Sequence, residues 1–221
     1  MPKAAANREK LLNAGLRKEV RTRGPSPEKT AQTRCAVVSA ALVEFLEKGF
    51  ADATMESVAR RAGVAKGTPY RYFPTKEALF SGVVQQEIAG AFIGFDASQR
   101  ETSESIEAFL RRSILAATKD IERKGRAAIA RLVIVEGVRF PALVEIYRLE
   151  MIDPLLDRIR RLLAEARQAG ELRNDLLVHH PHLVLAPILT GIINNQLLDT
   201  AHPLDIPSLL EMQLDLIFQR N

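Results

Sequence analysis

The chain has 221 residues, of which 47% are hydrophobic and 26% are charged, proportions close to those of soluble globular proteins. This composition excludes a small disulfide-stapled scaffold and a wholly disordered chain. The formal net charge of +4 is unevenly distributed, because residues 1–80 hold fifteen basic and eight acidic side chains, whereas residues 81–221 hold sixteen and nineteen. A basic front part and a weakly acidic rear part indicate that the front part contacts a polyanion.

The expected compartment follows from the cysteine and from the apolar stretches. A single cysteine, Cys35, cannot form a disulfide within the chain, and Lys3, Arg8 and Lys10 interrupt any secretory signal near the first residue. The longest nearly apolar stretch, residues 183–193, is shorter than the roughly 20 residues of a membrane span. We therefore expect a cytoplasmic protein without a membrane segment.

Residues 1–28 form the first predicted segment. They combine seven basic with three acidic side chains and end in a stretch that contains Gly24, Pro25 and Pro27. Helix-breaking residues after a polar stretch predict a flexible basic arm followed by a linker. The arm either adds phosphate contacts on DNA or is a solvated extension, and its charge supports both interpretations equally.

Helical periodicity follows the arm. Gly49 and Gly63 are expected to end the first two helices, Thr54 to cap the second, and Pro74 to end the third. Two short helices joined by a glycine-led turn form a helix-turn-helix, and we assign it to a domain over residues 29–80. The predicted helices cover residues 29–48, 55–62 and 66–73, and a fourth starts after Thr75 and runs toward Phe95.

The rear part, residues 81–221, also has the periodicity of helices and few strand signals, so the expected fold class is all-α. We expect a three-helix helix-turn-helix domain followed by this larger helical domain. The rear helices are predicted over residues 105–124, 127–138, 141–169 with a bend at Pro154, 180–198 and 206–220.

The third predicted helix has the character of a recognition helix, which places polar and aromatic side chains in the major groove of DNA. Phe73 at its end is expected to point into the core. For the outer positions we expect charge from Lys66 and Arg71, close backbone approach at Gly67, base or phosphate contacts from Thr68 and Tyr70, and a phosphate contact from the Tyr72 hydroxyl.

Over about residues 30–82 the chain resembles the TetR/AcrR family of transcriptional regulators. The resemblance is carried by Thr33-Arg34, Gly49-Phe50, Thr54-Met55, Val58-Ala59, Ala62-Gly63-Val64, Lys66-Gly67-Thr68, Tyr70, Tyr72-Phe73 and Lys76-Glu77-Ala78-Leu79. It implies an all-α homodimer that represses transcription until a small molecule releases it from DNA. It also implies that Thr54 and Lys76 anchor phosphates, that residues 66–72 face the major groove, and that Arg34 reaches the DNA backbone.

Two positions depart from that family pattern. Ala65 replaces the common serine, so the third helix is expected to lose an N-cap worth about 1 kcal/mol. Pro69 replaces an apolar residue in the first turn, where it costs at most one hydrogen bond. We expect an altered groove contact and an intact fold.

The rear domain more weakly resembles the C-terminal domain of a subset of AcrR-type regulators, over about residues 127–172. By this resemblance it would bind a small-molecule effector and dimerise. Polar residues within apolar helices are costly unless they are paired, which makes Arg131, Glu136, Arg139 and Tyr147 candidate ligand-binding residues. Salt bridges within the domain are the favoured alternative interpretation.

The last two predicted helices are too apolar to be wholly exposed. They form either the core of one subunit or, as the resemblance implies, a four-helix dimer interface in which Asn194, Asn195 and Gln196 set the register. On the second interpretation, a charge at Ile192 or Leu216 would produce monomers.

Other candidate sites are weaker. Cys35 next to Arg34 is a lone surface thiol for which redox sensing is disfavoured, and the histidines at 179, 180 and 182 favour a loop or a helix start over a metal site. The sequence contains no catalytic constellation and calls for no cofactor. We expect a ligand-responsive repressor on a palindromic operator, with a non-specific DNA-packaging protein as the alternative and an all-α enzyme as a third, disfavoured class.

Overall fold

The computed structural model describes residues 26–87, 99–118, 121 and 125–218. The chain divides into two compact units, residues 1–33 and residues 34–221. In the first unit, the described residues 26–33 include the first turns of helix α2, where the Ser26 hydroxyl accepts a hydrogen bond from the Lys29 N–H at 3.3 Å. The predicted arm up to residue 25 and the predicted continuation of the fourth helix past residue 87 lie outside the described residues.

The described residues of the front part form four helices, as the sequence predicts. They are α2 (Pro27–Asp52), α3 (Met55–Arg61), α4 (Thr68–Tyr72) and α5 (Lys76–Glu87). The predicted stop at Gly49 is a break in α2, because this glycine has φ of 78°. Beside the break, the rings of Phe45, Phe50 and Phe80 pack with centroids 5.5 to 6.0 Å apart.

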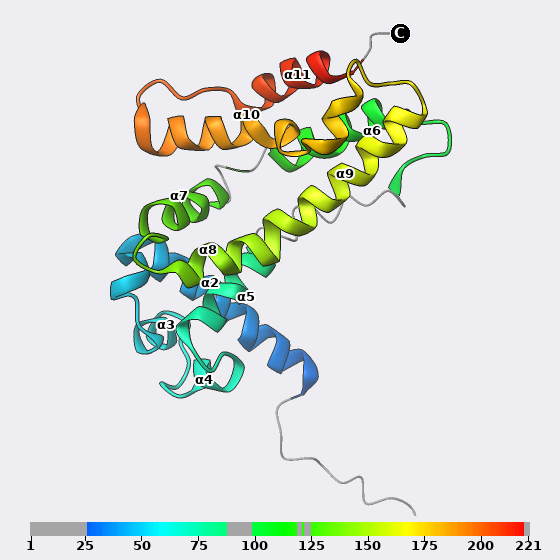
Figure 1. Ribbon diagram of the computed structural model, residues 1–221. Coiled ribbons are helices and arrows are strands. Elements are labelled where there is room, and N and C mark those ends of the chain that lie inside the picture. Colours follow the sequence, from blue (N-terminus) through cyan, green and yellow to red (C-terminus); the bar gives the residue numbers. More distant parts are fainter. Residues whose placement is uncertain (1–25, 88–98, 119–120, 122–124, 219–221) are drawn as a thin grey trace, which may run out of the picture. The chain divides into compact units, whose positions relative to one another are not determined.

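The rear part is also helical, so the all-α prediction is confirmed. The described residues add one isolated β-bridge, between Leu172 and Phe218. The elements, shown in Figure 1, are α6 (Ile106–Thr118), α7 (Arg126–Glu136), α8 (Pro141–Tyr147), the π-helix η3 (Arg148–Ile152), α9 (Asp153–Gln168), the 3₁₀-helix η4 (Asp175–His179), α10 (His182–Ile193), the π-helix η5 (Asn194–Leu198) and α11 (Ile206–Ile217).

The long helix predicted over residues 141–169 is interrupted where Pro154 occurs. Pro154 lacks an N–H and its ring crowds the carbonyl four residues earlier, and the chain forms the π-helix η3 just before it. A wider turn relieves that crowding. The interruption places Glu150 within η3, where its carboxylate accepts a hydrogen bond from the Ser81 hydroxyl of α5 at 2.9 Å.

Helices α10 and α11 pack closely against each other, at the opposite end of the second unit from α3 and α4 (Figure 1). A side chain at Gly191 would meet Ile206 at 2.4 Å, so the glycine permits this approach. Ile192 is only 5% exposed and belongs to the subunit core. A charge at Ile192 would therefore disrupt the subunit itself, and the earlier expectation that it would only split a dimer is corrected.

Asn195 has a different role from the predicted one. It is buried, and its side chain donates to the Leu204 carbonyl at 2.9 Å and accepts from the Leu204 N–H at 2.7 Å. Both bonds close the connection between η5 and α11 within one subunit. The expectation that Asn195 sets the register of a dimer is replaced by this intrasubunit role.

Among the described residues, no helix has the length and apolar character needed to cross a membrane.

Candidate nucleic-acid interface

Helix α3 begins with a capping box. Thr54 adopts an extended conformation, and its hydroxyl accepts a hydrogen bond from the Ser57 N–H at 3.1 Å. The Ser57 hydroxyl in turn accepts a bond from the Thr54 N–H at 3.2 Å, so two of the unpaired N–H groups of this helix start are satisfied. The exposed Thr54 hydroxyl keeps its own proton as a donor, which suits the phosphate contact predicted for it.

The turn between α3 and α4 depends on Gly63, which has φ of 67°, a conformation that glycine adopts without steric cost. The turn extends over residues 62–67, so α4 begins at Thr68. The prediction of a helix from Lys66 is therefore wrong by two residues, and Lys66 and Gly67 lie in the turn.

Because Gly67 is the N-cap of α4 and no side chain of the described residues caps it, Ala65 does not occupy the cap position. The expectation that alanine at position 65 removes an N-cap from this helix is therefore corrected. Pro69 lies in the first turn, where the sequence predicts that a proline is tolerated.

The two faces of α4 differ in burial. Pro69 and Phe73 are buried, and Phe73 packs so closely on α5 that a side chain at Gly82 would meet its ring at 2.6 Å. This anchoring confirms that Phe73 points inward. The outward side presents Lys66, Gly67, Tyr70 and Arg71, which are all exposed, with Tyr70 at 52%. We call these four residues the reading surface.

Within the reading surface, Lys66 has a partner that the sequence did not suggest. Its ammonium lies 2.5 Å from the Glu56 carboxylate of α3, and this hydrogen bond raises the pKa of Lys66 above its ordinary value. Both side chains are largely exposed. A phosphate that binds Lys66 would share the ammonium with Glu56 or replace that carboxylate.

Three other predicted DNA-binding residues are half-buried. The Arg34 guanidinium lies 5.1 Å from the centroid of the Phe73 ring, a cation–π distance. Tyr72 packs against the core, which leaves only part of its side chain accessible, and Thr68 is also partly covered. The phosphate contact of Tyr72 remains a prediction.

Lys76 lies at the start of α5 and binds the main chain. Its ammonium donates to the carbonyls of Phe50, Ala51 and Ala53 at 2.6, 3.0 and 3.0 Å, and it lies 4.6 Å from the Phe50 ring centroid. We call residues 49–53 the joint, since they run from the break in α2 at Gly49 to the residue before the Thr54 cap of α3. The phosphate contact predicted for Lys76 would compete with these three bonds.

Glu136, a candidate ligand-binding residue, contacts the other side of the joint. Its carboxylate accepts hydrogen bonds from the Phe50 N–H at 2.9 and 3.1 Å and from the Ala51 N–H at 3.3 Å. The two partners are more than eighty positions apart in the sequence, and no sequence pattern predicts their contact. Glu136 therefore has main-chain partners in the joint.

The other candidate ligand-binding residues line neither the hollow between α2 and α3 described below nor a second hollow, which Thr118, Ile121 and residues 203–207 line. Arg139 is exposed, with its guanidinium 5.2 Å from the Phe140 ring centroid, and Arg131 is half-buried. Tyr147 packs against the core, and burial raises its pKa above the ordinary value of 10.0. Their ligand-binding role remains a prediction.

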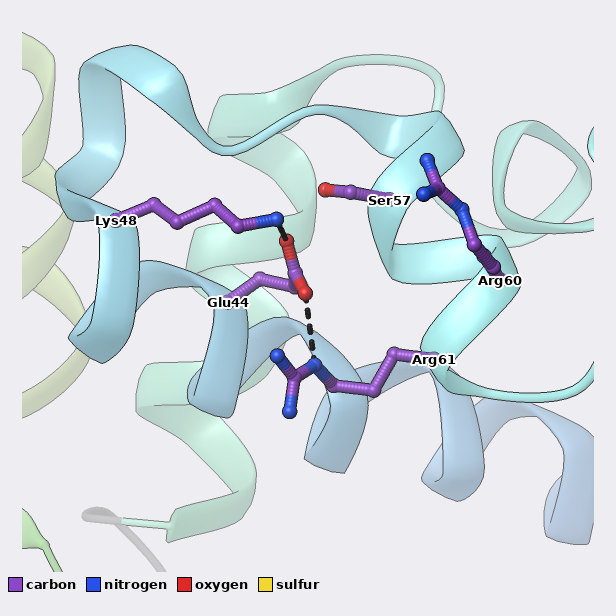
Figure 2. A pocket seen from close by; sticks show the side chains of 5 residues that line it. All are labelled: Glu44, Lys48, Ser57, Arg60 and Arg61. Carbon is purple, nitrogen blue, oxygen red and sulfur yellow. Dashed lines mark hydrogen bonds and ion pairs between the residues drawn. The ribbon is translucent and has the colours of Figure 1, made fainter.

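A hollow of about 320 Å³ between α2 and α3 is lined by Glu44, Lys48, Ser57, Arg60 and Arg61. Figure 2 shows the Glu44 carboxylate held between the Lys48 ammonium and the Arg61 guanidinium, at 2.5 and 2.7 Å. Hydrogen bonding to the carboxylate, to which Lys48 contributes most, followed by Ser57 and Arg61, lowers the pKa of Glu44 from 4.5 to about 2. The cluster joins α2 to α3 and so holds together the two helices that precede the reading surface. The burial of Glu44 could have been predicted from the sequence, because helical spacing places position 44 on the same buried face as Val37 and Ala41.

Comparison with known proteins agrees with this geometry. A model of "Bacterial regulatory proteins, tetR family" matches residues 37–83, and a model of "AefR-like transcriptional repressor, C-terminal domain" matches residues 108–177. The HTH-type transcriptional regulator UidR of Escherichia coli strain K12 is 26% identical over 163 residues, which cover 73% of this chain and 80% of UidR.

Solved structures show the same likeness. The flavonoid-responsive regulator FrrA is 27% identical with a TM-score of 0.60, and the match covers 86% of this chain and all of that one. The fatty acid degradation regulator FadR of Bacillus halodurans, at 20% identity, has a TM-score of 0.70 over 88% of this chain and 96% of its own, which supports the fold alone.

Proposed function

Because the chain belongs to the TetR family of bacterial transcriptional regulators, we propose that it is a ligand-responsive repressor. It binds a palindromic DNA operator as a homodimer, and a small molecule releases it. It acts in the cytoplasm, without a cofactor and without enzymatic activity. The likeness to UidR over most of both chains supports the assignment to transcriptional regulation.

The observation that carries the proposal is the reading surface. Tyr70 and Arg71 are exposed on α4, while Phe73 is buried. The packing of Phe73 therefore holds α4 in place beneath the exposed side chains. Arginine can bind guanine bidentately, and tyrosine can bind a phosphate. The Thr54 hydroxyl and Lys66 supply phosphate contacts beside them.

Dimerisation is supported by apolar side chains that one subunit leaves exposed on α10, η5 and α11. A symmetric pair would bury them and place two reading surfaces on half-sites about 34 to 36 Å apart or a multiple of that distance. An effector that favours another spacing would shift the population off the operator. The exposed residues are Leu183, Leu189, Leu197, Leu198, Met212 and Leu216.

The likeness to FrrA, whose name describes it as flavonoid-responsive, makes flavonoids the first compounds to screen as effectors. A compound that binds only the folded state raises the midpoint of thermal unfolding, by an amount that grows with the logarithm of its concentration above Kd. A true effector would also lower the affinity for the operator.

The experiment is selection of bound sequences from a random DNA pool, followed by affinity measurements for the selected and for random duplexes. We expect a palindromic sequence and a specificity ratio of about 10³ or more. A ratio near one would instead support the non-specific DNA-packaging protein.

We expect Arg71→Ala to weaken binding to the selected duplex about tenfold or more, because a base or phosphate contact is lost. Arg167→Ala is the matched control, since it removes the same charge from an exposed position at the end of α9. Equal affinity of both variants would contradict the assignment of the reading surface.

A further inference from the structure

We propose that Glu136 is the positioning residue through which the rear domain controls the helix-turn-helix, an inference that rests on the proposed function. Glu136 ends α7, within the part that resembles a repressor C-terminal domain. Its carboxylate binds the joint immediately before α3. Movement of α7 therefore acts directly on the segment that carries the reading surface.

The joint is shaped to accept this carboxylate. Gly49 has φ of 78°, and a side chain there would meet the Glu136 carboxylate at 2.5 Å. Any other residue would both strain the backbone and block the approach. The consequence is that two consecutive N–H groups, those of Phe50 and Ala51, point at one carboxylate and are satisfied by it.

The Phe50 peptide is held from both sides by opposite charges. Glu136 accepts from its N–H, while Lys76 of α5 donates to its carbonyl at 2.6 Å. The Phe50 ring also packs on Phe140, with centroids 5.3 Å apart. Glu136 and Phe140 lie in the same turn, between α7 and α8. This turn therefore contacts Phe50 twice, since Glu136 binds its main chain and Phe140 packs on its ring.

A second link between the two parts runs through α5, where Ser81 donates to Glu150. The Glu87 carbonyl at the end of α5 also accepts a hydrogen bond from the Arg126 guanidinium of α7 at 2.7 Å, and α5 packs against α8 and η3. The Glu136 contact holds two main-chain N–H groups of the joint itself, so it links α7 directly to the segment before α3, whereas contacts on α5 reach the joint through Lys76. For this reason we assign the coupling to Glu136.

Coupling between two sites is reciprocal, so it can be measured without knowing the effector. If operator DNA holds the joint in one conformation, it should also slow amide hydrogen exchange in α7. This slowing should require Glu136. The test is amide hydrogen exchange of the full-length protein, free and bound to the selected duplex, followed in the fragments covering residues 49–53, 126–136 and 182–193.

In the free protein, we expect Glu136→Gln to speed exchange of the Phe50 and Ala51 amides about tenfold, because a charge-assisted acceptor is lost. Exchange in residues 182–193 should stay at the wild-type rate, which separates a local effect from global unfolding. Glu145→Gln is the matched control, since Glu145 is an exposed glutamate of α8 that pairs with Arg148. We expect it to leave all three fragments unchanged.

In the bound protein, we expect the duplex to slow exchange of residues 126–136 in the wild type and in Glu145→Gln, but not in Glu136→Gln. If Glu136→Gln fails to fold, Glu136→Asp serves instead, because its shorter carboxylate cannot span both amides. Equal protection of residues 126–136 in wild type and variant, or unchanged exchange at the joint, overturns the inference. Failure of the proposed function looks different, since the wild type would then select no DNA sequence at all.

Discussion

Glu44 shows how one buried carboxylate connects two helices of the DNA-binding part. It is 3% exposed, and its two oxygens accept hydrogen bonds from Lys48 of the same helix and from Arg61 of α3. Arg61 also pairs with Glu47. The bonds to two cations stabilise the ionised form and lower the pKa of Glu44 to about 2.

Stability should therefore fall in acid because of Glu44. Its pKa in the folded protein lies below the value of 4.5 expected when it is unpaired, so the stabilisation is complete above pH 4.5 and is lost as the pH falls toward 2. We expect Glu44→Gln to lower the free energy of unfolding by about 1 to 2 kcal/mol at pH 7. We also expect it to flatten the pH dependence below pH 5, as measured by urea unfolding.

The exposed Glu28 of α2 provides the control for this prediction. Glu28→Gln should leave both the stability and its pH dependence close to those of the wild type. A Glu44→Gln variant with the wild-type acid profile would show that the Glu44 ion pairs do not contribute to stability.

Helices α3 and α4 are too short to be stable by themselves, at seven and five residues. They depend on caps and on packing against α2 and α5. The sequence predicted the Thr54 cap correctly, because threonine before an apolar run is a local signal. It placed the start of α4 two residues early, because no side chain caps this helix and so no local signal marks its first residue.

We expect Thr54→Ala to destabilise the protein by about 1 kcal/mol, because the Ser57 N–H loses its acceptor. Thr54→Ser should be near neutral, since serine retains the hydroxyl. Urea unfolding measures both variants, and equal losses for alanine and serine would argue against a capping role.

At the scale of the whole molecule, α10 and α11 leave several leucine side chains exposed, where the proposed dimer interface lies. Leu189 and Leu216 are 52% and 71% exposed, which is uncommon for several leucines on adjacent elements. The neighbouring core residues of the same helices, such as Ile188 and Leu214, are buried within the subunit. The buried faces of the two helices therefore belong to the subunit core, and the exposed faces are available for the proposed dimer interface.

We expect the double variant Leu189→Glu, Leu216→Glu to be monomeric in sedimentation velocity and to bind the selected duplex at least tenfold more weakly. A monomer engages only one half-site and loses the gain from linking two. Val138→Glu is the control, because Val138 is 92% exposed but lies between α7 and α8. An intact dimer in the double variant would reject this interface.

The sequence by itself determined the all-α fold, the order of the front helices and the Thr54 cap of α3. These follow from apolar spacing, caps and helix-breaking residues, which act within a few positions along the chain. The tertiary structure alone decided the partners of Lys76, Glu136 and Asn195 and the burial of Ile192. Such contacts depend on where separate helices meet, because a carboxylate or an ammonium acquires its role only from the groups that packing brings to it.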